Sequence, residues 1–150
     1  MARPYDIRER SRLFSDEVFV FCEHLKEKSE RHVPLIDQLN DAAGSIGANL
    51  EEAKDAQSKK DFIHKNSLAL KEARESRHWL RLAHGRERSL RKEADPLMQE
   101  SSEIVAIIST IIVNAKSNPN QLSLRKNKSL ALLRERNHLI GLRVGRFHSG

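Results

Sequence analysis

The chain has 150 residues, a formal net charge of +6, and few aromatic residues: five Phe, one Trp and one Tyr. This length suits one domain with a modest core, and the frequent Leu, Ile, Ala, Glu, Lys and Arg favour helices packed by aliphatic side chains. The lone Cys22 excludes an intramolecular disulfide and a cysteine zinc cluster and favours a cytoplasmic location, and the N-terminal residues MARPYDIRER lack the apolar run of a signal peptide.

The first predicted helix covers about residues 7–30. Its apolar stripe has the 4-3-4 spacing of an amphipathic helix and consists of Phe14, Val18, Phe21 and Leu25. A short turn at residues 31–33 follows, and Pro34 suits the first turn of the next helix because proline needs no backbone N–H there.

The second predicted helix covers about residues 34–56. Its apolar stripe consists of Leu35, Leu39, Ala42, Ala43, Ile46, Leu50 and Ala53. Gly44 and Gly47 each cost about 1 kcal/mol of helix propensity relative to alanine. We therefore expect them either to permit a tight crossing with another helix or to be merely tolerated.

The third predicted helix starts after Ser58, which with Asp61 resembles a capping box. We expect it to end near His84, with Gly85 in the C′ position. A charged connection at residues 86–94 follows. Asp95 and Pro96 then resemble an N-cap and a first helical residue.

The fourth predicted helix ends before Asn118 and Pro119, and its core residues are Leu97, Ile104, Ile108, Ile111 and Ala115. Its most apolar part, residues 104–115, is shorter than the roughly 20 residues that span a bilayer, so we expect a buried helix and no membrane span. Four such helices with short connections predict an all-α, antiparallel, up-down-up-down four-helix bundle.

The third helix has apolar side chains on two faces. Phe62, Ile63, Ala69, Ala73 and Leu80 share a face suited to the core, whereas Leu68, Trp79, Leu82 and Ala83 cluster on another. Leu13 and Val20 similarly point away from the stripe of the first helix. An exposed Trp and Leu cluster is typical of a protein contact, so we predict a homo-oligomer whose interface contains Leu13, Val20, Leu68, Trp79 and Leu82. The alternative is that residues 86–94 or the C-terminal segment fold over this face.

A set of polar residues borders the predicted core: Ser45, Asn49, Glu52, Lys71, Arg74, Glu75 and Arg77. We interpret it mainly as a satisfied network in which Glu52 or Glu75 pairs with Arg74 or Arg77. The alternative is a small-molecule or catalytic pocket using Asn49, Glu52, Lys71 and Glu75. Glu75 and His78 have the spacing of a di-iron helix, but the second Glu-x-x-His motif is missing, and no catalytic residue, metal or cofactor is expected.

The positive charge lies at the C-terminal end. Residues 1–116 carry 20 Lys and Arg against 20 Asp and Glu, whereas residues 117–150 carry seven basic residues against Glu135 alone. We predict a bundle domain over 1–116 and a basic tail over 117–150 that is either disordered or an amphipathic helix. Its candidate nucleic-acid contacts are Arg125, Lys126, Lys128, Arg134, Arg136, Arg143 and Arg146; a membrane surface, a protein partner or a tail without function are the alternatives.

Two motifs resemble a known bacterial family. S-x-G-A-N-x-x-E-A spans residues 45–53, and F-I-x-K followed by A-L-K-E-A-R-E and W-L spans residues 62–80. Both are similar to the four-helix-bundle proteins encoded in intervening sequences of 23S ribosomal RNA genes. The likeness covers about residues 5–116 and leaves residues 120–150 outside the family pattern.

The resemblance implies a homopentameric ring without enzymatic activity. It also implies kinship with the accessory protein of diversity-generating retroelements, which partners a reverse transcriptase and nucleic acid. We therefore expect a non-enzymatic oligomer associated with RNA or a ribonucleoprotein; the alternative is a scaffolding or adaptor oligomer that docks a protein such as a reverse transcriptase. The charge-neutral body of this chain departs from the basic ring of that relative.

Overall fold

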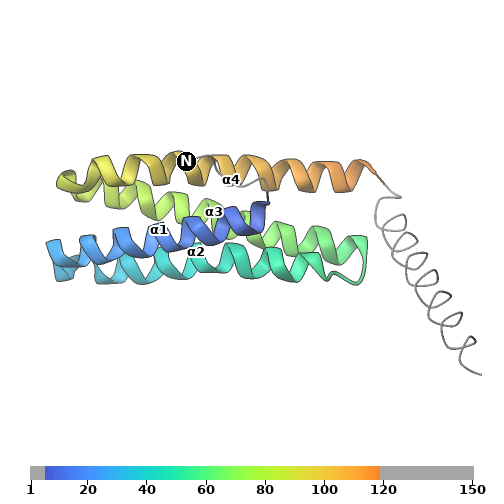
Figure 1. The fold of residues 1–150 in the computed structure, drawn as a ribbon, viewed down its shortest axis with the longest axis horizontal. Coiled ribbons are helices and arrows are strands. Elements are labelled where there is room, and N and C mark those ends of the chain that lie inside the picture. Colours follow the sequence, from blue (N-terminus) through green and yellow to red (C-terminus); the bar gives the residue numbers. More distant parts are fainter. Residues whose placement is uncertain (1–5, 119–150) are drawn as a thin grey trace, which may run out of the picture. The chain divides into compact units, whose positions relative to one another are not determined.

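A computed structural model of the protein describes residues 6–118, and within them four helices run alternately in opposite directions (Figure 1). The helices are α1 (Ile7–Lys28), α2 (Val33–Lys54), α3 (Lys59–Arg86) and α4 (Arg91–Ser117). Short 3-10 turns, η1 (Glu30–His32) and η2 (Arg88–Leu90), precede α2 and α4. The described residues contain no strand, and the predicted all-α four-helix bundle is confirmed.

The bundle belongs to a compact unit that ends at Lys116. The predicted tail, 117–150, lies outside the described residues except for Ser117 and Asn118, so the division of the chain into these two domains stays a prediction.

Helix α3 starts where its capping residues predict, directly after Ser58. The Ser58 Oγ accepts a hydrogen bond from the Asp61 backbone N–H at 3.0 Å, and the Asp61 carboxylate accepts one from the Gln57 N–H at 3.1 Å. These two bonds satisfy N–H groups that have no partner inside the helix. The sequence therefore encodes this boundary locally.

The end of α3 is not where the sequence predicts it. The helix passes through Gly85, which has no left-handed backbone conformation, and continues to Arg86. The Glu87 N–H donates to the Ala83 carbonyl at 2.8 Å, while the Glu87 carboxylate accepts from the Ser89 N–H at 3.3 Å and starts η2. The Glu87 side chain caps η2 directly after α3, so the chain turns there without a left-handed glycine at the end of the helix.

The start of α4 also differs from the prediction. The helix begins at Arg91, so Asp95 is not its N-cap and Pro96 lies inside the helix. Leu90 and Ala94 are buried and continue the stripe formed by Leu97 toward the N-terminus. We attribute the early start to this burial, which outweighs the intrahelical hydrogen bond that is lost because Pro96 has no backbone N–H.

The core is formed by the predicted stripes. All four stripe residues of α1 and all seven of α2 are buried, and in α4 the buried residues include Leu97, Ile104, Ile108 and Ala115. Ile111 is only partly buried, and its neighbour Ile112 occupies the core instead. In α3 the face is narrower than predicted, because Phe62 and Ile63 are partly exposed.

Helices α2 and α3 make the most extensive helix–helix contact. Both helices carry small buried residues, Ala42 and Ala53 on α2 and Ala69, Ala73 and Ala83 on α3. Ala83 is therefore a core residue, and its assignment to the outer face of the third helix is wrong. Small side chains allow the two backbones to approach each other.

The two α2 glycines do not make such a contact inside the subunit. A Cβ placed on Gly44 or Gly47 would meet no heavy atom within 4 Å. The expectation of a tight crossing at these glycines is therefore wrong within this chain, whereas Ala42, Ala43 and Ala53 of the same helix are buried.

Candidate subunit and nucleic-acid interfaces

A buried ion pair, which the sequence analysis did not predict, joins α1 to α4. The Arg10 Nε donates to Glu100 Oε1 at 2.6 Å and Nη2 donates to Oε2 at 2.9 Å. Glu100 is 4% exposed, and the same guanidinium also contacts Glu103. These carboxylates raise the pKa of Arg10 because they stabilise its charged form.

A sequence signal for this pair was present. Arg10 lies four residues before Phe14, and Glu100 lies four residues before Ile104, so each interrupts an apolar stripe with a charge. A second contact, His24 Nδ1 to Glu93 Oε2 at 2.6 Å, links the same two helices and raises the pKa of His24. We conclude that these charges fix how α1 packs on α4.

The predicted polar network does not come together as one cluster. Asn49 donates its side-chain N–H to the Ser45 carbonyl at 2.8 Å, a bond within α2. The Glu52 carboxylate contacts Lys65 of α3 and raises the pKa of that lysine. The expected pairing of Glu52 with an arginine is therefore wrong.

The other predicted network members lie along α3. Glu75 accepts a hydrogen bond from the Trp79 indole N–H at 3.4 Å, and Lys71 lies 3.8 Å from Glu72. Within residues 6–118, no carboxylate lies within ion-pair distance of Arg74 or Arg77. Arg74 and Arg77, which we expected to pair with Glu52 or Glu75, therefore make no ion pair with a described carboxylate.

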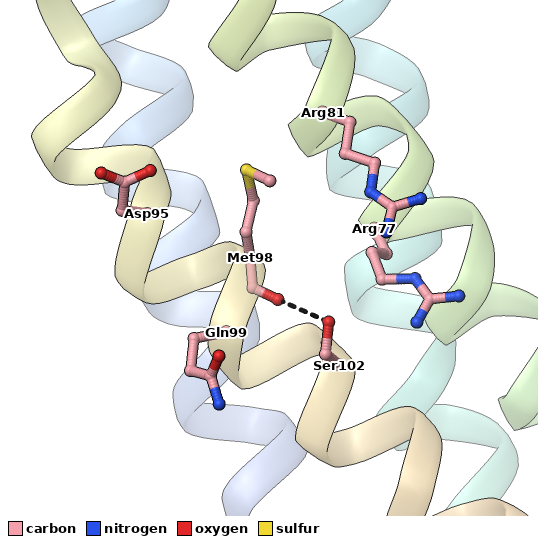
Figure 2. Close-up of a pocket in the computed structure, with 6 residues that line it drawn as sticks. All are labelled: Arg77, Arg81, Asp95, Met98, Gln99 and Ser102. Carbon is pink, nitrogen blue, oxygen red and sulfur yellow. Dashed lines mark hydrogen bonds between the residues drawn. The ribbon is translucent and has the colours of Figure 1, made fainter.

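A cavity of about 240 Å³ lies between α3 and α4. Figure 2 shows its lining residues: Arg77, Arg81, Asp95, Met98, Gln99 and Ser102. The two arginine side chains extend from α3 in a similar direction, and the Ser102 hydroxyl donates to the Met98 carbonyl at 3.0 Å. Of these residues, only Arg77 was among the predicted site residues.

The predicted interface residues differ in exposure. Val20 is 53% exposed, whereas Trp79 and Leu82 are partly buried and pack against the core of their own subunit. Leu13 and Leu68 are also partly buried. The outer face of α3 is therefore less open than the sequence suggests, and the role of all five residues in subunit contacts stays a prediction.

Two strongly exposed apolar residues were missed by the sequence analysis. Phe19 is 57% exposed and Val113 is 59% exposed. Phe19 adjoins Val20 on α1, and both lie outside the apolar stripe of that helix. The signal for Phe19 was its position between the core residues Val18 and Phe21, where a solvated helix usually carries polar side chains.

The groups suited to catalysis or metal binding are few in the described part of the chain. Cys22 is buried, and burial raises the pKa of its thiol to about 12, which disfavours the reactive thiolate. Among residues 6–118, no three His, Cys, Asp or Glu side chains gather in a way that could hold a metal ion.

Residues 88–117 are long and apolar enough to cross a membrane by length and composition alone. Core helices of soluble proteins pass the same test, and α4 carries the buried Glu100. The absence of a membrane span stays a prediction.

The candidate nucleic-acid contacts of the tail, Arg125 to Arg146, lie outside the described residues.

Comparison with known proteins bears on the whole bundle. A family model described as 23S rRNA-intervening sequence protein matches residues 3–110. The chain is also similar to a crystallised protein of unknown function from the S23 ribosomal protein family of Bacteroides thetaiotaomicron. The two are 31% identical with a TM-score of 0.63, and the match covers 71% of this chain and 98% of the other. No curated protein matches the chain.

Proposed function

We propose, from the premise that the chain belongs to the 23S rRNA-intervening sequence protein family, that it is a non-enzymatic homo-oligomeric bundle associated with RNA or a ribonucleoprotein. The proposed assembly is a pentamer, the number that the motif resemblance implies, in the bacterial cytoplasm. The RNA association rests on this family membership, on the excess of basic residues in 117–150, and on cations of α3 that have no carboxylate within ion-pair distance among the described residues. The name of the similar Bacteroides protein, from the S23 ribosomal protein family, agrees with it.

Exposed apolar side chains support the oligomer. Phe19 and Val20 are each more than half exposed in one subunit, and burying both against a second copy would remove apolar surface from water. Gly44 and Gly47 have open space around them, so the backbone of another subunit can approach α2 there.

The oligomer is tested by light scattering on the full chain. One chain has a mass of 17.2 kDa, and we expect the wild type to have about five times that mass. The variants Val20→Glu and Trp79→Ala should lower it, while Asp16→Asn, an exposed substitution on α1, should not. Because Trp79 also packs on its own core, its variant is accompanied by a circular dichroism melt. A monomeric wild type would refute the assembly.

Charge supports the RNA association. The formal excess of +6 lies entirely in residues 117–150. On α3, the cations Arg74, Arg77 and Arg81 have no carboxylate within ion-pair distance among residues 6–118. Cations that are not neutralised within the protein can release the counterions of a nucleic acid.

The RNA association is tested by fluorescence anisotropy with a 23S ribosomal RNA fragment over a series of salt concentrations. Each phosphate neutralised should contribute a slope of about −0.7 to −0.9 in log affinity against log salt. Replacing the seven basic tail residues by glutamine should weaken binding sharply; unchanged binding would eliminate the tail as the contact. No binding by the wild type at low salt, combined with a protein pull-down that survives nuclease treatment, would favour the adaptor function instead.

A further inference from the structure

We propose that the cavity between α3 and α4 is a phosphate-binding site in which Arg77 and Arg81 supply the charge and the N–H donors. The phosphate is either part of an RNA backbone or free, and the RNA source rests on the proposed function. This site lies in the bundle, whereas the cations considered from the sequence lie in the tail.

The two arginines are placed to act together. They are four residues apart on α3, so they lie on the same side of the helix, one turn from each other. Both line the cavity, and in Figure 2 their side chains extend in a similar direction. Ser102 and Gln99 of α4 line the cavity from the other helix.

The charge balance favours an anion there. On α1, the arginines Arg8, Arg10 and Arg12 each pair with at least one carboxylate. On α3, neither Arg77 nor Arg81 has a carboxylate within ion-pair distance among residues 6–118. Two neighbouring guanidinium groups repel each other, and a bound anion would remove that repulsion.

One acidic residue also lines the cavity. Asp95 Oδ1 lies 3.1 Å from His84 Nε2, so this carboxylate has a partner of its own. In the view of Figure 2, Asp95 lies on the opposite side of Met98 from both guanidinium groups. The acidic side chain is thus at one end of the cavity and the arginines are at the other.

The shape and the donors suit a phosphate. A cavity of about 240 Å³ exceeds the roughly 30 Å³ that one water molecule occupies, so there is room for a small anion with part of its hydration shell. The guanidinium groups come from α3. On α4, the Ser102 hydroxyl donates to the Met98 carbonyl and the Gln99 amide donates to Glu103, so the arginines supply the donors for an anion. Arginine forks bind phosphate oxygens in pairs, and two forks one helical turn apart offer several N–H donors to one tetrahedral group.

The test uses the full chain, with the variant Arg77→Gln/Arg81→Gln and the control Arg86→Gln/Arg88→Gln. The control removes the same charge from exposed arginines that do not line the cavity. Calorimetric titration with inorganic phosphate and anisotropy with a short RNA are measured on each protein, and circular dichroism checks the fold.

We expect the cavity variant to lose phosphate binding and to bind RNA about tenfold more weakly than the control. The slope of its log affinity against log salt should become shallower by about one unit for each RNA phosphate that the variant no longer neutralises.

The outcomes separate the two proposals. Phosphate binding that only the cavity variant loses, with no RNA binding by any protein, supports the site and its free-phosphate source while contradicting the proposed RNA function. RNA binding that the cavity variant and the control lose equally, with no phosphate binding by the wild type, overturns the site and leaves the RNA function standing.

Discussion

The Arg10–Glu100 ion pair allows a prediction about stability. Counting side-chain atoms alone, Arg10 is 13% exposed and Glu100 is 5% exposed. Removing one partner of such a pair costs about 3–5 kcal/mol. We expect Arg10→Met to fall within this range because it leaves a buried carboxylate without its guanidinium. With a urea dependence of about 2 kcal/mol/M, the unfolding midpoint should fall by about 2 M.

Glu100→Met should cost less, about 1–3 kcal/mol, because Arg10 keeps its contact with the half-exposed Glu103. The double variant Arg10→Met/Glu100→Met should recover much of the loss, since two apolar side chains replace a desolvated pair. Arg12→Met is the matched control, because Arg12 pairs with Glu9 at the surface and should change the midpoint little.

The assay is urea unfolding followed by circular dichroism at one fixed protein concentration, because an oligomer unfolds in a concentration-dependent way. The reasoning is refuted if Arg10→Met shifts the midpoint no more than Arg12→Met does. A double variant less stable than both single variants would also contradict it, because the pair would then contribute more than its desolvation costs.

The remaining predictions concern single positions. Gly85→Ala should stabilise the chain by about 0.5–1 kcal/mol, because Gly85 is helical with open space around it; a lower thermal midpoint would contradict this. His24 should titrate above its ordinary pKa by NMR, and Glu93→Gln should lower that pKa. Because the pKa of His24 is raised in the folded state, its contact with Glu93 stabilises the fold fully below the unfolded pKa. This stabilisation is lost as the pH rises through the folded pKa. An effect of Glu93→Gln on stability that did not change with pH would disprove this account. Cys22, with its pKa raised to about 12, should react with a thiol reagent only on unfolding, and rapid native labelling would show otherwise.

The sequence predicts those parts of the fold that depend on local patterns. The stripe of α1, with Phe14 and Leu25, and the Ser58 cap of α3 are confirmed because periodicity and capping act within one helix. The start of α4 was missed because burial of Leu90 and Ala94 extends the helix N-terminal to Pro96, and this depends on what the residues pack against.

The site is harder to predict, because it depends on pairs of residues that lie far apart in the sequence. Arg10 and Glu100 each interrupt an apolar stripe, which signals a buried charge but not its partner. Arg77 was expected beside an acidic residue of the network, whereas the cavity places it with Ser102 of another helix. Sequence spacing alone does not show which helices are neighbours, so it could not place Arg77 beside Ser102.

Native mass spectrometry of the full chain mixed with a 23S ribosomal RNA fragment tests the central claim most directly, because it reports subunit number and bound RNA together. We predict an assembly of several copies of the 17.2 kDa chain, about five, that carries RNA at low salt and releases it as salt rises. A single subunit without RNA at every salt concentration would contradict both the oligomer and the RNA association.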